Sequence, residues 1–202
     1  MYLQFTAGDQ DRIYRDICEK YRRVAESPEG RFRYPTGRTG LEGLGYDEAL
    51  IARLPEEAVA SYCGVGNPFL LAPLREGEAV LDVGCGGGVD TMVAAMIAGP
   101  DGKAVGIDLI PEMLERAERN LARSGLTNVT FQQASGEALP FPDGSFDVVI
   151  SNGVFNLIPD KQKALREALR VLKPGGRLMI ADQVLATEIP ADTESMVETW
   201  AG

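Results

Sequence analysis

The sequence contains no histidine among its 202 residues. This absence excludes Ser-His-Asp and Cys-His catalytic triads and any metal site built on imidazole ligands. An enzyme with this sequence must therefore work without an imidazole base. Cysteine is also scarce, because Cys18, Cys63 and Cys85 form an odd set without the spacing of a disulfide framework. We expect free thiols, which are typical of a cytoplasmic protein.

Basic residues are fewer than acidic ones, with 20 Lys and Arg against 30 Asp and Glu and a net charge of −10. Such a chain is repelled by phosphate backbones and by anionic membrane surfaces, so we expect neither nucleic acid nor a membrane as a partner. No apolar run is long enough to span a membrane, and the N-terminus does not have the pattern of a secretory signal. The content of 45% hydrophobic and 25% charged residues is that of a folded globular domain.

From residue 78 onward, short apolar runs alternate with amphipathic stretches. The runs predict strands at 78–83, 103–109, 129–133, 147–151 and 177–185. The amphipathic stretches predict helices at 89–98, 111–124 and 161–172. This alternation predicts an α/β fold with a doubly wound, mostly parallel sheet, of which five strands are visible.

The first 77 residues have a different character. A helix is predicted at 9–25, a loop rich in Gly, Pro and Arg at 28–45, and short helices at 47–54 and 55–62. This segment has too little apolar content to fold alone. We therefore predict an N-terminal helical cap on the substrate side at 1–77 and a cofactor-binding α/β domain at 78–202.

The motif VLDVGCGGGVD at 80–90 carries the functional signal. It places a strand, a glycine-rich turn and a helix start in succession, which is the geometry of a nucleotide-type site at the carboxyl edge of a sheet. A dinucleotide fingerprint needs a third glycine where Val89 stands. Asp82, two residues before Gly84, suits a cationic ligand better than a pyrophosphate. The pattern therefore favours S-adenosylmethionine, which carries an ammonium and a sulfonium, over a nicotinamide dinucleotide.

A second acid, Asp108, ends the second predicted strand. At this spacing from the glycine-rich turn, its carboxylate can accept both ribose hydroxyls of an adenosine. Tyr21 could close over the cofactor from the N-terminal helix, because aromatic rings attract a sulfonium cation. The alternative for Tyr21 is a half-buried packing residue.

The C-terminal part of the chain resembles the class I S-adenosylmethionine-dependent methyltransferases. The successive matching stretches are VLDVGCGGG, GIDL, ASGEALPFPDGSFDVVISN and LREALRVLKPGGRLMIAD. The resemblance implies a Rossmann-like sheet of seven strands in the order 3-2-1-4-5-7-6. Only five are visible here, so we expect a fifth-strand edge that is covered by a homodimer contact, by the N-terminal segment or by a downstream piece. A helix is predicted at 193–200.

This resemblance also implies roles for individual residues. It places the turn at the methionine moiety, Asp108 at the ribose and Leu109 on the adenine, while Ser135 replaces an acid that the family has near the adenine amino group. Glu137 is a less certain substitute for that acid. The cofactor-binding residues predicted in this way are Tyr21, Asp82, Gly84, Cys85, Gly86, Asp108, Leu109, Ser135, Gly136, Glu137 and Asn152.

A narrower resemblance connects YDEALIARLPEEAVASYCGVGNPF and VISNGVFNLIPDK to the bacterial arsenite methyltransferase branch. Arsenite methylation needs three thiolates, since As(III) is soft and three-coordinate. Val65 and Gly153 stand where two of the matching cysteines fall in that branch, and a third would lie past the last residue. The resemblance thus implies the fold without the metalloid ligands, and no metal site.

The sequence therefore predicts an S-adenosylmethionine-dependent methyltransferase that acts on a small-molecule acceptor other than arsenite. The candidates on the substrate side are Asn152, Asn156 and Cys63, and no residue stands out as a catalytic base. Two alternatives remain open. One is a protein that binds the cofactor without methyltransferase turnover, which the missing cysteines favour, and the other is a nicotinamide dehydrogenase.

Overall fold

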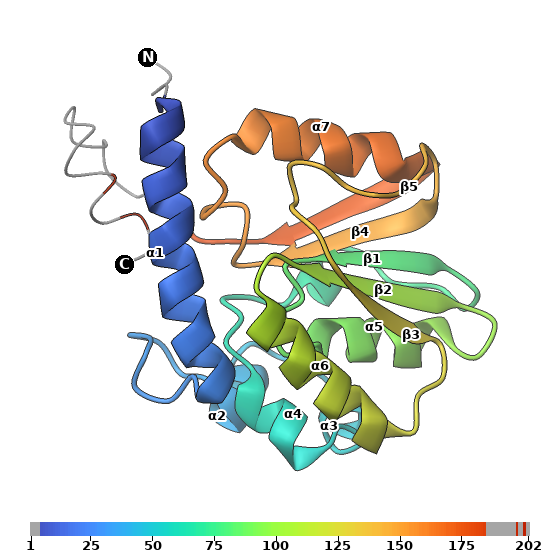
Figure 1. Cartoon of the computed structure of the whole chain (residues 1–202). Coiled ribbons are helices and arrows are strands. Elements are labelled where there is room, and N and C mark those ends of the chain that lie inside the picture. The colour runs from blue at the N-terminus through green and yellow to red at the C-terminus, as the bar shows by residue number, and fades with distance from the viewer. Residues whose placement is uncertain (1–4, 185–196, 198–199, 201–202) are drawn as a thin grey trace.

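A five-stranded parallel sheet forms the centre of the computed structural model, which describes residues 5–184, 197 and 200 (Figure 1). The strands lie in the order β3-β2-β1-β4-β5, and each neighbouring pair is parallel. Their bounds are β1 Ala79–Val83, β2 Lys103–Asp108, β3 Val129–Gln133, β4 Phe146–Asn152 and β5 Leu172–Ala181. The predicted doubly wound fold class is confirmed.

Helices cover both faces of the sheet. On one face, α5 (Val89–Ala98) and α6 (Pro111–Ser124) pack against inward-facing strand residues such as Val80 and Val148. On the other face, α7 (Lys161–Val171) packs against the alternate strand residues, such as Leu81. Because successive side chains of a strand point to opposite faces, the nearly continuous apolar composition of β1 and β4 buries both sides.

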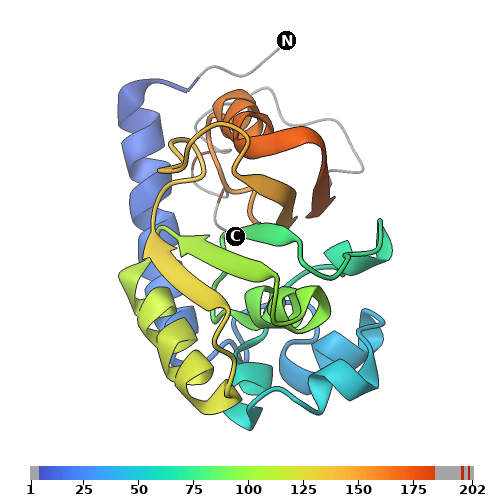
Figure 2. The same ribbon diagram turned by 90° about the vertical axis from the view of Figure 1, so that its right-hand side faces the viewer.

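The N-terminal segment shares the core of the sheet domain. Helix α1 (Ala7–Glu26) crosses the carboxyl ends of the strands and lies beside α6 (Figures 1 and 2). Residues 37–70 form three short α-helices and a 3-10 turn beside α5. These elements are α2 (Gly37–Gly43), α3 (Glu48–Ile51), α4 (Glu56–Ser61) and η1 (Pro68–Leu70). Buried residues of this region, including Leu41 and Ile51, form one cluster with Met92 of α5. The division at residue 77 stays a prediction.

Two predicted elements differ from the structure. The predicted loop at 28–45 is wrong in its second half, because α2 forms there and buries Leu41 completely. The fifth strand starts at Leu172 instead of residue 177. The register shift between the pairs Phe146–Leu172 and Val148–Arg177 accommodates the Pro-Gly-Gly sequence inside the strand. The strand ends at Ala181, and the predicted end at residue 185 lies outside the described residues.

The helix predicted at 193–200 falls almost entirely outside the described residues. Of its members, Val197 is buried against Ile13 and Ile17 of α1, and the indole N–H of Trp200 donates to the carbonyl of Leu157 at 2.7 Å. Among the helices that the structure describes, none has the length and apolar character needed to cross a membrane.

Gly88 provides a test of the turn between β1 and α5. Its φ of 82° lies in the left-handed region, and an added Cβ would stand 2.6 Å from the ring of Phe131. Gly125 has a similar φ of 73° with open space around it. We expect Gly125→Ala to lower the free energy of unfolding by about 1–2 kcal/mol, the cost of a left-handed residue. Gly88→Ala should cost about 1–3 kcal/mol more from overpacking. Urea unfolding measures both, and equal losses would contradict this account of the turn.

Candidate functional site

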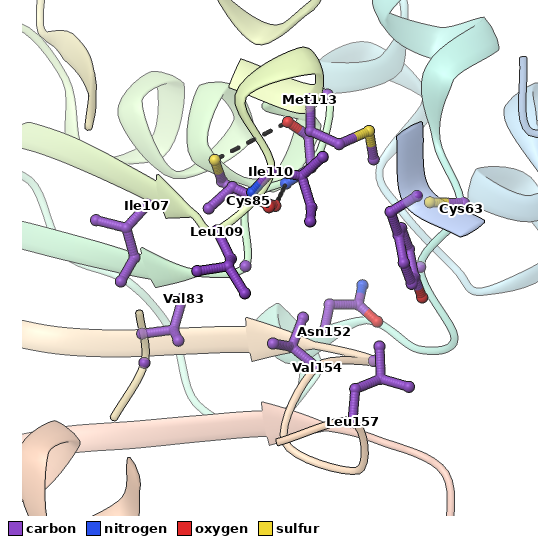
Figure 3. Close-up of a pocket in the computed structure, with 18 of the residues that line it drawn as sticks. Cys63, Val83, Cys85, Ile107, Leu109, Ile110, Met113, Asn152, Val154 and Leu157 are labelled. Carbon is purple, nitrogen blue, oxygen red and sulfur yellow. Dashed lines mark hydrogen bonds between the residues drawn. The ribbon is translucent and has the colours of Figure 1, made fainter. Parts of the chain in front are cut away.

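A pocket lies at the carboxyl ends of the strands, between the sheet and α1 (Figure 3). Ten of the residues predicted from the sequence line this pocket: Tyr21, Cys63, Gly84, Cys85, Gly86, Asp108, Leu109, Ser135, Gly136 and Asn152. Residues from six separate segments of the chain therefore meet at the edge that the motif predicts. Asp82, Glu137 and Asn156 are not among the lining residues.

The glycine-rich turn forms the floor of the pocket between β1 and α5. The backbone N–H groups of Gly84 and Cys85 both donate to the carbonyl of Ile107 at 2.8 Å, which fixes the turn to the end of β2. Gly84 has a φ of 77°, and a Cβ there would stand 2.3 Å from Val154. Glycine at this position therefore satisfies both the backbone conformation and the close approach of the loop after β4.

Asp108 closes the other side of the turn. Its carboxylate accepts the backbone N–H of Gly86 at 2.8 Å and that of Ile110 at 2.9 Å. Burial raises the pKa of Asp108, while these backbone hydrogen bonds oppose the rise. Each carboxylate oxygen has a second lone pair for a ligand hydroxyl. The side chain faces the pocket beside Leu109, so the pair can serve a ribose and an adjacent flat ring.

Asp82 lies behind the turn and not in the pocket. Only 2% of its surface is exposed, and its carboxylate accepts the hydroxyl of Thr91 at 2.6 Å. Burial raises its pKa well above the ordinary value. Asp82 therefore supports the turn from behind, and its predicted contact with the methionine moiety stays a prediction. Cys85 lines the pocket as a small buried residue whose thiol pKa is also raised by burial.

The end of the pocket beyond β3 is formed by Ser135 and Gly136. Glu137 next to them accepts the hydroxyl of Tyr14 at 2.6 Å and the backbone N–H of Asp160 at 3.1 Å. Glu137 thus connects α1 to the loop before α7. Its role in adenine recognition, like that of Ser135, stays a prediction.

Helix α1 covers the pocket with one face. Tyr14, Ile17 and Tyr21 line it, at spacings of three and four residues that place them on the same side of a helix. Only Tyr21 was expected from the sequence. The spacing of Tyr14 and Ile17 relative to Tyr21 is the signal that could have identified them.

The substrate side is built around the side-chain amide of Asn152 at the end of β4. Its Oδ1 accepts the backbone N–H groups of Val65 and Gly66 at 2.8 and 3.1 Å. Its Nδ2 donates to the carbonyl of Gly66 at 2.7 Å and to Oδ2 of Asp90 at 2.9 Å. Tyr46 donates its hydroxyl to Oδ1 of Asp90 at 2.6 Å. The amide therefore holds the segment 64–66 against the sheet. Asn152 also lines the pocket.

Asp90 and Tyr46 were missed in the sequence. Asp90 ends the motif at 80–90 and lies in the first turn of α5, where an acid also complements the helix dipole. An acid in the first turn of a helix is explained by the helix dipole alone, so the sequence gives no reason to expect a pocket residue here. The pairing with Tyr46 and Asn152 depends on contacts between distant segments, which no local pattern encodes.

Val65 and Gly153, where the arsenite branch has cysteines, face each other. A Cβ on Gly153 would stand 3.3 Å from both methyl groups of Val65. Cys63 lines the same pocket, and Figure 3 shows it well separated from Cys85. In the part of the chain that the structure describes, no three His, Cys, Asp or Glu side chains are placed to hold a metal ion. The remaining candidate, Asn156, is not among the residues that line the pocket, although Val154 and Leu157 of the same loop are, and its backbone N–H donates to Asp182 at 2.9 Å.

The ionisable side chains that bring charge to the pocket are acidic. Asp90 and Asp108 face it, and no Lys or Arg is among its described lining residues. Burial raises the pKa of Tyr21, Tyr62 and Cys63, the last to about 12, so these groups are protonated at neutral pH. The pocket suits a positively charged ligand, and it lacks a free general base among the residues that the structure describes.

A parallel sheet in this order, with a glycine-rich turn after β1 and an acid at the end of β2, defines a Rossmann-like cofactor-binding domain. The chain belongs to the methyltransferase domain family, which it matches over residues 74–201. Its cofactor is S-adenosylmethionine, as predicted. The family and the chain's relatives give no support to the alternative of a nicotinamide dehydrogenase. The negative charge of the pocket fits a cofactor that carries a positively charged sulfonium.

Several relatives support this assignment. The chain is 41% identical to an arsenite methyltransferase from Halobacterium salinarum, over 83% of this chain and 42% of the relative. It is 44% identical to a ubiquinone/menaquinone biosynthesis C-methyltransferase from Pasteurella multocida, over 54% of this chain and 41% of the relative. A solved arsenic(III) S-adenosylmethionine methyltransferase from Chlamydomonas reinhardtii is 43% identical, covering 66% of this chain and 47% of that one, with a TM-score of 0.61. The chain spans about half the length of these relatives.

Asp108 tests the adenosine side of the site. We expect Asp108→Ala to weaken S-adenosylmethionine binding by about 1–3 kcal/mol, the scale of hydrogen bonds to a charged group. Asp108→Asn, which keeps one acceptor oxygen, should lose less. Isothermal titration calorimetry measures the affinities, and the free energy of unfolding controls for loosening of the turn at Gly86. An unchanged affinity in a folded Asp108→Ala variant would remove Asp108 from the site.

Proposed function

We propose that this chain transfers the methyl group of S-adenosylmethionine to a small, uncharged acceptor with a soft nucleophilic atom, other than arsenite. The observation that carries the proposal is the pocket itself, which is lined by carboxylates, contains no cationic side chain among its described residues and lacks a free base. S-adenosylmethionine supplies a methyl carbon that is already activated by the sulfonium. The protein then has to hold the acceptor in line, and positioning of this kind can supply about 7–11 kcal/mol of the barrier.

In this proposal the cofactor extends along the carboxyl edge of the sheet. Asp108 and Leu109 hold the ribose and adenine, Ser135 and Gly136 border the adenine, and the turn at Gly84 approaches the methionine moiety. Tyr21 on α1 covers the cofactor. The first 77 residues close the substrate side, and free thiols fit a reducing compartment such as the cytoplasm.

The chemistry of the acceptor is limited by the side chains that line the pocket from segments 63–64 and 153–157. These segments contribute Val154 and Leu157 with a single thiol, Cys63, while Val65 packs behind Gly153. Two apolar groups in place of thiols favour an apolar molecule over a metalloid, because one thiol cannot make a three-coordinate As(III) site. An anionic acceptor is disfavoured, since the pocket contains carboxylates and no cationic side chain among its described residues.

A panel of acceptors tests this function. We expect formation of S-adenosylhomocysteine with uncharged soft nucleophiles that have no proton to release, such as thioethers and selenoethers, which become sulfonium or selenonium products. We expect neither turnover nor stoichiometric capture of As(III). Mass spectrometry of the methylated products, with a no-acceptor control, gives the readout. Turnover of arsenite would contradict the proposed acceptor class. Binding of S-adenosylmethionine without transfer to any member of the panel would contradict the proposed activity.

We also propose that the edge of β5 is covered by a second copy of the chain. Most residues of β5 are only half-buried, in contrast to the fully buried β1, and Leu178 and Ile180 are among them. An edge strand with apolar side chains is a template for pairing. Sedimentation velocity at micromolar concentration should show a homodimer, with slow amide exchange along β5. A monomer with fast exchange along β5 would contradict this proposal.

A further inference from the structure

Asp90 stands at the substrate end of the pocket, and the proposed function gives it no role so far. Its side chain lines the pocket from the first turn of α5 and is only 7% exposed. The hydroxyl of Tyr46 and the amide of Asn152 donate to its two oxygens, at 2.6 and 2.9 Å. These two bonds fix the carboxylate at the end of β4.

The order of the strands places Asp90 relative to the cofactor, and this step rests on the proposed function. Asp108 at the end of β2 and Ser135 beyond β3 take the adenosine. The ligand then has to continue past the turn after β1 toward Asn152 on β4. The sulfonium and the amino acid part therefore lie at the end of the pocket where Asp90 is fixed.

No cationic side chain of the described pocket lining offsets the charge of Asp90. The titratable groups that face it from the surrounding elements are Tyr46, Tyr62, Cys63 and Asp82, none of which carries a positive charge. Burial accordingly raises the pKa of Asp90 to about 6, against the hydrogen bonds from Tyr46 and Asn152 that lower it. A buried carboxylate with two donors and no cation is stabilised by a ligand that brings a positive charge.

We propose that the Asp90 carboxylate recognises the positive charge of the sulfonium, so that the site binds S-adenosylmethionine more tightly than S-adenosylhomocysteine. The two molecules share the adenosine and the amino acid group, and they differ in the methyl group and in the charge on sulfur. After transfer the sulfur is an uncharged thioether, and the attraction to Asp90 is lost. Asp90 thereby favours exchange of the product for a new cofactor.

The ratio of the two affinities separates this role from a structural one. Removal of a purely structural residue would weaken both ligands, and so would removal of a contact to the amino acid group that they share. Loss of a charge that faces the sulfonium weakens S-adenosylmethionine alone. The ratio therefore needs no knowledge of the methyl acceptor.

Isothermal titration calorimetry of Asp90→Asn at neutral pH provides the test. We expect S-adenosylmethionine binding to weaken about tenfold, the equivalent of one pKa unit of charge interaction, with little change for S-adenosylhomocysteine. Tyr46→Phe is the matched control, because it removes a hydrogen bond to Asp90 and keeps the carboxylate. The lost hydrogen bond raises the pKa of Asp90, so this variant and the unchanged protein are compared at a pH of about 8.5, where the carboxylate stays ionised and the ratio should be the same in both. Asp101→Asn, at an exposed position, controls for net charge.

The pH dependence of the unchanged protein gives a second test that needs no variant. A bound cation lowers the pKa of Asp90, so S-adenosylmethionine binding releases a proton near pH 6 and weakens as pH falls below about 6. Protonation of Asp108 affects the shared ribose and cancels in the ratio. An equal loss of both ligands in Asp90→Asn, or a ratio that does not change with pH, would overturn the inference. Failure of the unchanged protein to bind either ligand would instead overturn the proposed function on which it rests.

Discussion

The side-chain amide of Asn152 joins three segments that are far apart in the chain. Its hydrogen bonds to Val65 and Gly66 hold the N-terminal segment, and its bond to Asp90 holds the start of α5. Because all four partners of a primary amide are supplied within the protein, this wall of the pocket is fixed before any ligand arrives. The substrate side of the pocket therefore depends on the contacts between these three segments.

The chemistry of the pocket follows from what surrounds this wall. Two carboxylates, Asp90 and Asp108, line the pocket together with apolar side chains such as Val154 and Leu157. Methyl transfer from a sulfonium needs no base when the attacking atom has no proton to lose, and the absence of histidine from the sequence is compatible with such a reaction. Positions 65 and 153, where the resemblance to the arsenite branch implies cysteines, lie against each other, so both differences fall at one place in the fold.

The fold and the cofactor side could be predicted because their signals are local. The glycine-rich turn, Asp108 and the alternating elements each occupy a few consecutive residues, and the structure brings them to one edge. Helix α2 was missed because burial of Leu41 outweighs a sequence rich in Gly, and the start of β5 was missed because a register shift absorbs a Pro-Gly-Gly sequence. Asp90 was missed because its partners lie 44 and 62 residues away.

The central claim is that the pocket between α1 and the carboxyl ends of the strands binds S-adenosylmethionine. Hydrogen exchange followed by mass spectrometry, with and without saturating cofactor, tests this claim directly. The account predicts slower exchange in the turn at 84–88, at 107–110 and in the face of α1 that carries Tyr14 and Tyr21, since all three surround the pocket. Protection confined to other parts of the chain, with these three segments unchanged, would contradict it.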